Sequence, residues 1–595
     1  MSYYKQNNNN RVRNNNTPNQ EVKTPYAFVP LPKTFFTPDW ADRISQDVPF
    51  SDGITGSISF EMVAQTPVFV RDGQEDTSSF CKSSDGRYFI PATSIKGEIS
   101  SVLRIMSYGK VGQVRNGTFG KRNLNDSTYR DAMSNVHCGW MYFTEKGVEI
   151  EDCDIPARVS LQDIDDIFNT SYVEFVKNGD NFRSDYNRTA KKKYEMFPKD
   201  KSKVCLFRED DRPKNRVDNR EIVKIIRTTQ KDAFYGEIVF TGQPGVRRMT
   251  NNRWAGKFYE FVFVCFEEKI VKPVSDSVFQ DFETIHSASP DYVEFRKQEL
   301  YNGKHIPIFF LMDEKGDVIS IGLSYLYKYP YKKSIYDAIP DNNQDVSKKD
   351  LCDCLFGYST PQQSLKGRVH FGHAFAKDSP TPDKGKDFYM SQPRASFYPF
   401  YVKDGKSWDN AEQIAGWKRY PIRIQSRLLP SPQGTEAMKS KAEMLPAGTA
   451  FQETIRFHNL RPIELGALLS AITFHGNNDK CLHSIGLGKP LGYGAIMINN
   501  LLLETDSELK DSLAYMAVFE EQMTSIDGNW LDSPQLKELL LMAIGIPGNK
   551  AASFEYLNDP KAYYRLKANN QKLRSFSERV DGEQFKISSL KNKTK

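Results

Sequence analysis

The stretch Ile90-Pro-Ala-Thr-Ser-Ile-Lys-Gly-Glu-Ile-Ser-Ser-Val-Leu-Arg-Ile-Met106 predicts the clearest helix of the chain. From Ile95 to Met106, apolar residues recur every three or four positions, which is the pattern of a helix with one buried face. Thr93 and Ser94 belong to the residue types that are favoured as helix N-caps. We therefore expect a helix that begins at these two residues and packs against a sheet or another helix.

Two cations lie on a different face of this predicted helix. Lys96 falls in the first turn and Arg104 two turns later, on the same side. Free backbone N–H groups and the helix dipole favour an anion at a helix N-terminus. A lysine near that end adds to this attraction, so Lys96 and Arg104 indicate an anion-binding surface. A solvated polar face is the alternative.

A second stretch, Gly486-Leu-Gly-Lys-Pro-Leu-Gly-Tyr-Gly494, holds four glycines within nine residues. Glycine adopts positive φ angles and lets the backbone approach a ligand closely. Phosphates bind exposed backbone N–H groups, often with a lysine as counter-charge. Pro490 after Lys489 excludes a Walker loop, and Leu491 stands where a dinucleotide fingerprint needs glycine. The stretch therefore predicts contact with another phosphate ligand, with a tight packing turn as the alternative.

Composition sets broad limits on the class of protein. The 595 residues are enough for about two to four structural units. Lysine and arginine total 81 against 75 acids, so the net charge of +6 allows basic patches without requiring a nucleic-acid partner. No apolar stretch approaches the roughly 20 residues of a membrane span. The Asn-rich N-terminus also lacks the apolar core of a secretory signal. We expect a cytoplasmic protein without a membrane partner.

The eight cysteines do not form a metal-binding pattern. They are scattered, and Cys352-Asp-Cys354 has no matching second pair. Structural zinc sites normally show two closely spaced ligand pairs. We therefore expect reduced, buried thiols, no metal site and no cofactor.

Composition and periodicity predict an α+β protein in five segments. Strands are expected at 56–63, 451–457 and 495–498, and a second helix at 464–474. Within the middle of the chain, 236–240 should pair with 258–264, and 306–311 with 318–321. The five segments are a disordered tail at 1–25, the first part of a core at 45–124, a strand-rich insertion at 125–344, the second part of the core at 345–510, and a helical region with a basic tail at 511–595.

Four motifs, taken in order, resemble the RAMP superfamily of CRISPR-associated proteins, and most of all its large subunits found with type III (Csm/Cmr-type) effector systems. The first motif usually reads Ile-Pro-Gly-Ser-Ser-Leu-Lys-Gly in that family, whereas Ala92 and Thr93 replace its Gly and Ser here. The resemblance extends over about residues 45–505. Its motifs are Ile90–Gly97, Leu355-Phe-Gly357, Gly367-Arg-Val369 and the glycine stretch.

This resemblance implies a ferredoxin-like, RRM-type core of order βαββαβ whose loops bind CRISPR RNA. The implied partners are CRISPR RNA, with target RNA as a further candidate, and other CRISPR effector subunits. Segment 125–344 is either an insertion or a second degenerate RRM. Proteins hold single-stranded RNA with cations, helix N-termini and stacking aromatic rings. The residues suited to these roles are Thr93, Ser94, Lys96, Arg104, Arg368, Gly486, Gly488, Lys489, Gly492, Tyr493 and Gly494.

A secondary RNA contact is expected from Arg247, Arg248, Arg253 and Trp254, which fall between two predicted strands. These residue types combine charge with a stacking surface. An ordinary solvated hairpin tip is the alternative.

Catalysis is a separate question. Some members of the family cut target RNA with an aspartate in the loop after the first strand, where this chain has Asp72 and Asp76. Such a carboxylate orients a 2′-hydroxyl or holds a divalent metal ion. A metal ion is expected only if the chain cuts RNA in this way. The family's RNA-processing branch often uses an N-terminal histidine, but no histidine precedes His137. Three hypotheses remain: an RNA-binding structural subunit, which we favour, an endoribonuclease on the same scaffold, and a protein-interaction scaffold without RNA contact.

Overall fold

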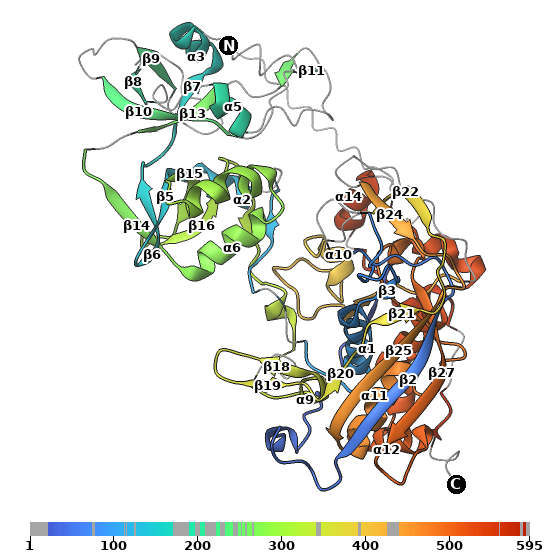
Figure 1. Ribbon diagram of the computed structural model, residues 1–595. Helices are drawn as coiled ribbons and strands as arrows, with labels where there is room; N and C mark the ends of the chain where they lie inside the picture. Colours follow the sequence, from blue (N-terminus) through green and yellow to red (C-terminus); the bar gives the residue numbers. More distant parts are fainter. Residues whose placement is uncertain are drawn as a thin grey trace. The chain divides into compact units, whose positions relative to one another are not determined.

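The computed structural model divides the chain into two compact units (Figure 1). Unit 1 consists of Met1–Val114 and Ala338–Lys595, and unit 2 of Arg115–Asp337. Both contain helices and strands in an α+β arrangement. The structure describes residues 22–590 except 74–77, 112–113, 115, 124–126, 170–189, 197–202, 209–221, 227–232, 242–247, 251–252, 256–258, 265–266, 341–346, 391–393, 425–438, 558–559, 570 and 583–586.

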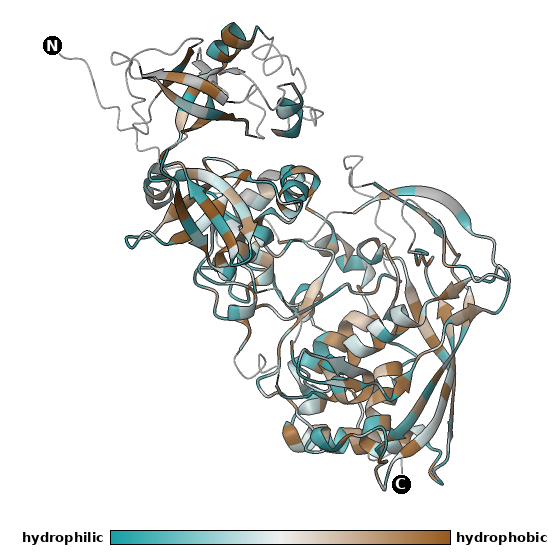
Figure 2. Ribbon diagram, turned by 60° about the vertical axis from the view of Figure 1, so that its left-hand side comes forward, coloured by the Kyte–Doolittle hydropathy of each residue, from teal (hydrophilic) through white to brown (hydrophobic). Residues whose placement is uncertain are grey.

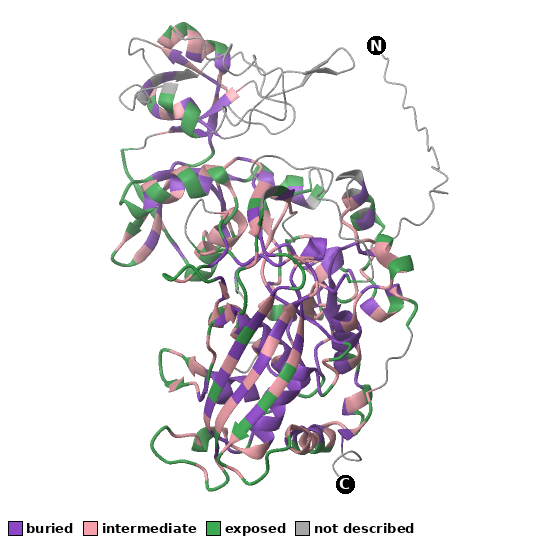
Figure 3. Ribbon diagram, turned by 45° about the vertical axis from the view of Figure 1, so that its right-hand side comes forward, coloured by how far each residue is buried: buried purple, intermediate pink, exposed green. Residues whose placement is uncertain are grey.

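The core of unit 1 is an antiparallel sheet. Its long central strand β2 (Ile54–Ala64) lies between β25 (Ala450–Leu460) and β27 (Ala495–Thr505), with Ile58 opposite both Ile455 and Leu503. Residues alternate between buried and more exposed along these strands (Figure 3), and hydrophobic and hydrophilic residues alternate with them (Figure 2), so one face of the sheet is covered. The strand order is β26 (His483–Ser484), β27 (Ala495–Thr505), β2 (Ile54–Ala64), β25 (Ala450–Leu460), β21 (Ala374–Ala376) and β3 (Phe89–Ile90), with β20 (Val369–His370) also paired to β25.

Helices pack on the buried face of this sheet. The helices α1 (Ala92–Met106) and α11 (Pro462–Thr473) pack against each other, and α12 (Ser512–Ile526) packs on α11. Nearly every residue of α11 is buried, as expected for a helix that is apolar on all sides and lies between a sheet and another helix. α13 (Pro534–Ile544) packs on α1. The C-terminal helices therefore share one hydrophobic core with the sheet.

Two sequence-based expectations for this unit were wrong in detail. Helix α1 begins at Ala92 and its N-cap is Pro91, so Thr93 and Ser94 lie inside the first turn. The capping acceptor comes from elsewhere, since the Ala92 N–H donates to His373 Nδ1 at 3.0 Å. The alternation of apolar and polar residues at 365–371 also predicts one strand, but Gly367 and Arg368 separate two short strands there.

Shorter elements complete unit 1. The pair β1 (Ala27–Val29) and β23 (Trp417–Arg419) is antiparallel and bears on the site described below. The other elements are η1 (Ala41–Arg43), α9 (Leu351–Phe356), β18 (Gly357–Ser359), β19 (Ser364–Lys366), β22 (Asp383–Tyr389), α10 (Tyr398–Tyr401), β24 (Lys439–Met444), η7 (Lys489–Leu491), η8 (Trp530–Asp532), η9 (Gly548–Phe554), α14 (Pro560–Ala568) and α15 (Phe576–Arg579).

Unit 2 contains two five-stranded antiparallel sheets. The two predicted strand pairs are confirmed, with Ile238 opposite Val262 and Phe310 opposite Ile321. The first sheet curls, because a parallel bridge brings Arg158 beside the end of its other edge strand. Its strands are β7 (Ala157–Ser160), β13 (Tyr259–Val264), β10 (Phe234–Val239), β8 (Lys203–Arg208) and β9 (Val223–Ile226).

The second sheet of unit 2 contacts the first through an apolar cluster that includes Phe261 and Phe263 from one sheet and Phe309 from the other. Its strands are β14 (Ile270–Val274), β6 (Gly147–Asp152), β5 (His137–Thr144), β15 (Ile306–Met312) and β16 (Val318–Gly322). The remaining elements are β4 (Gly120–Lys121), α2 (Ser127–Ser134), α3 (Leu161–Phe168), α5 (Ala190–Met196), β11 (Arg248–Thr250), β12 (Arg253–Ala255), α6 (Asp276–His286), η4 (Tyr292–Arg296), α7 (Lys297–Tyr301), β17 (Tyr329–Pro330) and η5 (Tyr336–Ala338), which leads into unit 1. Among the described residues, no helix has the length and apolar character to cross a bilayer.

Candidate functional site

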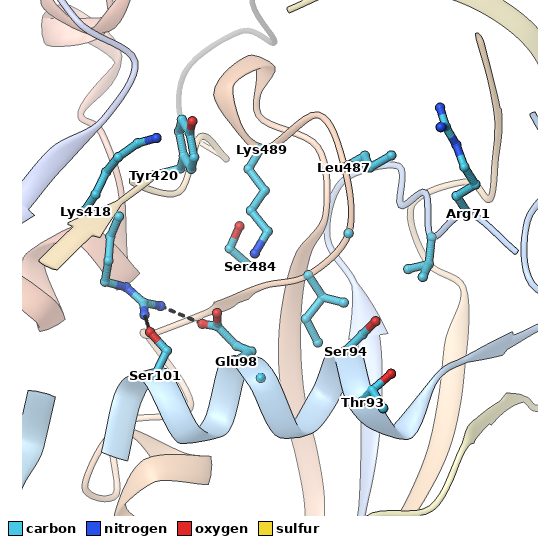
Figure 4. Close-up of a pocket in the computed structure, with 15 residues that line it drawn as sticks. Arg71, Thr93, Ser94, Glu98, Ser101, Lys418, Tyr420, Ser484, Leu487 and Lys489 are labelled. Atoms are coloured by element: carbon cyan, nitrogen blue, oxygen red, sulfur yellow. Dashed lines mark hydrogen bonds and ion pairs between the residues drawn. The ribbon is translucent and has the colours of Figure 1, made fainter. Parts of the chain in front are cut away.

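A pocket of about 560 Å³ in unit 1 lies over the N-terminal half of α1. Its walls come from four segments: the first turns of α1, residues 484–489 with the start of the glycine stretch, the end of β23 with Tyr420, and Val70 with Arg71. Figure 4 shows Thr93 and Ser94 on α1 below the loop that carries Lys489. The tertiary structure thus brings together the two motifs that stood out in the sequence.

The glycine stretch is held by the chain segment after β2. The Leu487 N–H donates to Phe69 O and the Gly494 N–H to Pro67 O, both at 2.9 Å. Between these anchors the chain makes the short helix η7, and a left-handed glycine stands at each end of it, with φ of 77° at Gly488 and 100° at Gly492. These four positions fix the path of the loop.

The glycines are needed because the chain approaches itself. A Cβ atom at position 494 would lie 1.9 Å from Ile485 O, and one at 486 would lie 2.2 Å from Phe69 O. At both positions φ is also positive. The tight-turn alternative therefore accounts for Gly486 and Gly494, and RNA contact by their backbone stays a prediction.

Four cations and one acid line the pocket. The cations are Arg71, Lys418, Arg419 and Lys489, and the acid is Glu98. Arg419 uses its guanidinium for the protein itself: Nη2 lies 2.6 Å from Glu98 Oε1 and Nη1 donates to Ser101 Oγ at 3.0 Å. One acid thus balances one cation, and the pocket keeps an excess of positive charge.

Glu98 is ionised despite its burial. Burial by itself would raise the pKa of Glu98, but Arg419, then His483 and Lys489, outweigh this effect and hold the pKa well below its usual range. The His483 imidazole is buried, and its Nδ1 lies 3.5 Å from Glu98 Oε1. The negative charge of Glu98 therefore holds the Arg419 guanidinium against the side of α1.

The two pocket lysines are only partly hydrated. Burial lowers the pKa of Lys489, although Glu98 opposes the shift. Burial also lowers the pKa of Lys418 to about 8. The Lys418 ammonium lies 4.7 Å from the centre of the Tyr26 ring and 4.8 Å from that of Tyr420. Cations that have lost part of their water attract an entering anion more strongly than exposed ones.

The other predicted cations of α1 lie elsewhere. Lys96 Nζ donates to the Phe356 carbonyl at 3.3 Å, and Arg104 Nε lies 3.4 Å from the buried Asp350. Neither lines the pocket, because its α1 residues, from Thr93 to Ser101, occupy a different face of the helix. The structure does not bring Lys96 or Arg104 together with Lys489, and their RNA contacts stay predictions.

The prediction for Arg368 was wrong. This side chain is fully buried, with Nη1 donating to Glu464 Oε2 at 2.9 Å and Nη2 to the Cys354 carbonyl at 3.0 Å. A second Nη1 bond reaches the Asn459 carbonyl. No part of this guanidinium reaches the surface, so Arg368 joins α9, β25 and α11 instead of contacting RNA.

The remaining predicted residues are placed only in part. Tyr493 is half-buried, and its ring centre lies 6.5 Å from that of Phe388. Asp72 lies in a hairpin beside the pocket residue Arg71, and its N–H donates to Ser79 O at 3.3 Å. Asp76 lies outside the described residues, and among those described no cluster of three metal-ligating side chains occurs. Catalysis by Asp72 and Asp76 stays a prediction.

The predicted secondary contact lies on a short hairpin of unit 2. Arg248 is in β11, and Arg253 and Trp254 are in β12, with Met249 opposite Trp254. Arg247 and the side chains of the other three lie outside the described part of the chain. Only the backbone pairing of this hairpin is therefore established.

Sequence reasoning missed the third wall of the pocket. Lys418, Arg419 and Tyr420 follow Trp417 in a short run of basic and aromatic residues. That composition is typical of nucleic-acid surfaces and was the available signal. Its position against α1 follows from the pairing of β23 with β1, where Arg419 lies opposite Ala27.

Comparisons with known proteins add limited information. No protein-family model matches the chain, and no curated protein sequence does. Among solved structures, Thermofilum pendens Csc2 matches with a TM-score of 0.14 and 16% identity, over 33% of this chain and 55% of that one. The chain thus spans about half the length of Csc2. A chain of the Type III-B Cmr-beta complex bound to cognate target RNA matches with a TM-score of 0.17 and 9% identity, over 74% and 96% of the two chains. Scores this low leave function to be argued from the site.

Proposed function

We propose that this chain is an RNA-binding structural subunit of a type III CRISPR effector ribonucleoprotein in antiviral defence, and that the unit 1 pocket holds the phosphate backbone of CRISPR RNA. One observation carries the proposal: the first turns of α1, the glycine stretch and the basic end of β23 line a single pocket. The motif resemblance to RAMP proteins supports the choice of CRISPR RNA as the ligand.

We further infer that the core of unit 1 is the ferredoxin-like core that this resemblance implies. Along the chain, β2, α1, β21, β25, α11 and β27 follow the order strand, helix, strand, strand, helix, strand. In the sheet these strands lie in the order β27-β2-β25-β21, with α1 and α11 packed together. Both observations support a βαββαβ core.

The chemistry of the pocket suits a sugar–phosphate backbone. Lys418 and Lys489 supply partly desolvated cations, and the hydroxyl groups of Thr93, Ser94 and Ser101 supply hydrogen-bond partners. The N-terminal turns of α1 add the positive end of a helix dipole. A site built from charge and hydroxyl groups binds a strand without selecting its base sequence. This property fits a subunit that must accept guides of any sequence.

The test removes the two lysines together. In Lys418→Ala/Lys489→Ala, RNA affinity should fall, and the slope of log affinity against log salt should decrease by roughly 0.7 for each lost phosphate contact. Affinity is measured by fluorescence anisotropy with a short single-stranded RNA over a range of salt concentrations. The matched control is Lys550→Ala, which removes a unit 1 lysine that pairs with Asp581 outside the pocket.

An unchanged salt slope in the double variant would show that the RNA does not contact this pocket. Sequencing the nucleic acid that co-purifies with the native protein tests the class of protein independently. Repeat-derived CRISPR RNA is the expected result, and RNA-free protein in an intact assembly would favour the scaffold hypothesis.

Affinity for RNA should also depend on pH. Phosphate stabilises the protonated ammonium of Lys418, so the pKa of this group, about 8 in the free protein, rises in the complex. The contribution of Lys418 is therefore complete below its pKa in the free protein and is lost as pH rises through its higher pKa in the complex. Binding measured from about pH 7 to about pH 9.5 should stay nearly constant up to about pH 8 and weaken above it. In Lys418→Arg, which stays charged, the decline should be smaller, with Lys489 responsible for what remains. Equal declines in both proteins would contradict this role for Lys418.

A further inference from the structure

Unit 2 contains a second pocket, of about 500 Å³, with a different character. It lies between the two sheets, with Trp140 from β5 on one side and Phe240, just after β10, on another. Tyr194 of α5 and Phe295 of η4 complete a lining of four aromatic side chains. Neither the sequence motifs nor the proposed phosphate site involves this pocket.

The planar groups of this pocket are already held in place. The Arg296 guanidinium lies 4.6 Å from the centre of the Tyr194 ring and 4.3 Å from that of Phe295. Arg296 is only 6% exposed, and its Nη1 lies 2.8 Å from Glu299 Oε2. At the rim, His305 stacks on Tyr142 with ring centres 4.2 Å apart and an interplanar angle of 9°. A flat ligand would therefore meet planar side chains that already have a fixed orientation before it binds.

The charges of this pocket balance. Three cationic side chains line it, and so do three acidic ones: Lys191, Arg296 and Lys304 with Glu195, Glu237 and Glu299. The unit 1 pocket, by contrast, has four cations for one acid. A lining with equal numbers of cationic and acidic side chains gives no net attraction for a phosphate. It does offer hydrogen-bond donors and acceptors side by side. The ligand that fits is uncharged, planar and able to both donate and accept hydrogen bonds.

We propose that this pocket binds an unpaired nucleobase, either from single-stranded RNA or from a free nucleotide. A base has two π faces for the aromatic lining and an edge that both donates and accepts, which matches Arg296 beside its acidic neighbours. The choice of a base over an aromatic side chain of a partner protein rests on the RNA binding proposed for unit 1.

The first experiment uses the full-length protein without substitution. The probes are AMP, GMP, CMP and UMP, a short single-stranded RNA, and an abasic strand of the same length, all measured by isothermal titration calorimetry. The intact strand should bind about ten- to a hundredfold more tightly than the abasic strand, because each stacked base contributes that much. Binding of a mononucleotide as tight as that of the intact strand would identify a free nucleotide as the ligand.

Variants then locate the base. Trp140→Leu should lose the preference for the intact strand, and Trp140→Phe, which keeps a stacking ring, should retain most of it. Tyr235→Leu is the matched control, since Tyr235 is an exposed aromatic residue of the same unit outside the pocket. If Trp140→Leu does not fold, His305→Ala at the exposed rim replaces it and should reduce the preference severalfold.

The outcomes separate the two proposals. Equal affinity for intact and abasic strands, with no binding of mononucleotides, would overturn the base pocket but leave the phosphate site of unit 1 intact. That result would point to a partner's aromatic side chain as the occupant. Binding of mononucleotides without binding of either strand would overturn the proposed function of unit 1 and keep the base pocket.

Discussion

Glu464→Ala is expected to lower the free energy of unfolding of unit 1 by about 3–5 kcal/mol. Glu464 is fully buried and accepts hydrogen bonds from Arg368, from Trp40 Nε1 at 3.0 Å and from the Arg461 N–H at 2.9 Å. Without this carboxylate, the Arg368 guanidinium is a buried charge with no counter-charge. Urea denaturation of the full chain, followed by circular dichroism, measures the loss.

A control variant shows whether the loss of stability comes from the burial of the ion pair or from the loss of any ion pair. Lys406→Ala removes an exposed lysine whose ammonium lies 2.9 Å from the Asp404 carboxylate, and it should destabilise the protein much less than Glu464→Ala. The double variant Arg368→Met/Glu464→Leu removes both charges and should be more stable than Glu464→Ala alone. A loss in Glu464→Ala as small as that of the control would contradict the buried ion pair.

Gly494→Ala should destabilise unit 1 by about 2–5 kcal/mol and weaken RNA binding with it. The added Cβ would lie 1.9 Å from Ile485 O, at a residue whose φ is 79°. Relieving this clash moves the chain and breaks the hydrogen bonds that join Gly494 to Pro67 and to Ile485. Since these bonds position Lys489 over α1, RNA affinity should fall even at temperatures where the variant is folded.

Gly448→Ala is the control for this substitution. Gly448 also belongs to unit 1 and has a φ of 88°, but a Cβ atom there meets nothing within 4 Å. It should cost only the backbone strain, about 1 kcal/mol, and leave RNA affinity unchanged. Equal melting temperatures for the two variants would show that the loop tolerates a side chain at Gly494 and is not the tight turn described above.

Local pattern predicted many of the elements that build the core. The apolar spacing from Ile95 to Met106 predicted α1, and alternation predicted the strands β2 and β25. The pattern did not predict where the helix begins. The helix starts at Ala92 because Pro91 adopts the extended N-cap conformation and His373, far along the chain, supplies the acceptor. A capping partner so distant in sequence leaves no local signal.

The functional site was only partly predictable for the same reason. Periodicity separated two faces of α1 but did not tell which one would line a pocket, and the glycine stretch turned out to lie over Glu98 instead of Lys96. Lys418 and Arg419 reach the pocket through strand pairing with β1, near the other end of the chain.

The sequence by itself determined the existence of a helix over 95–106, of the long strands and of a glycine-rich turn, since each depends on side-chain spacing and on backbone freedom within a few residues. Only the tertiary structure decided which cations share a pocket and which are buried. Arg368 shows why: its charge is hidden because Glu464, on another element, compensates it inside the core. Burial and pairing are properties of neighbours in space, and these neighbours come from distant parts of the chain.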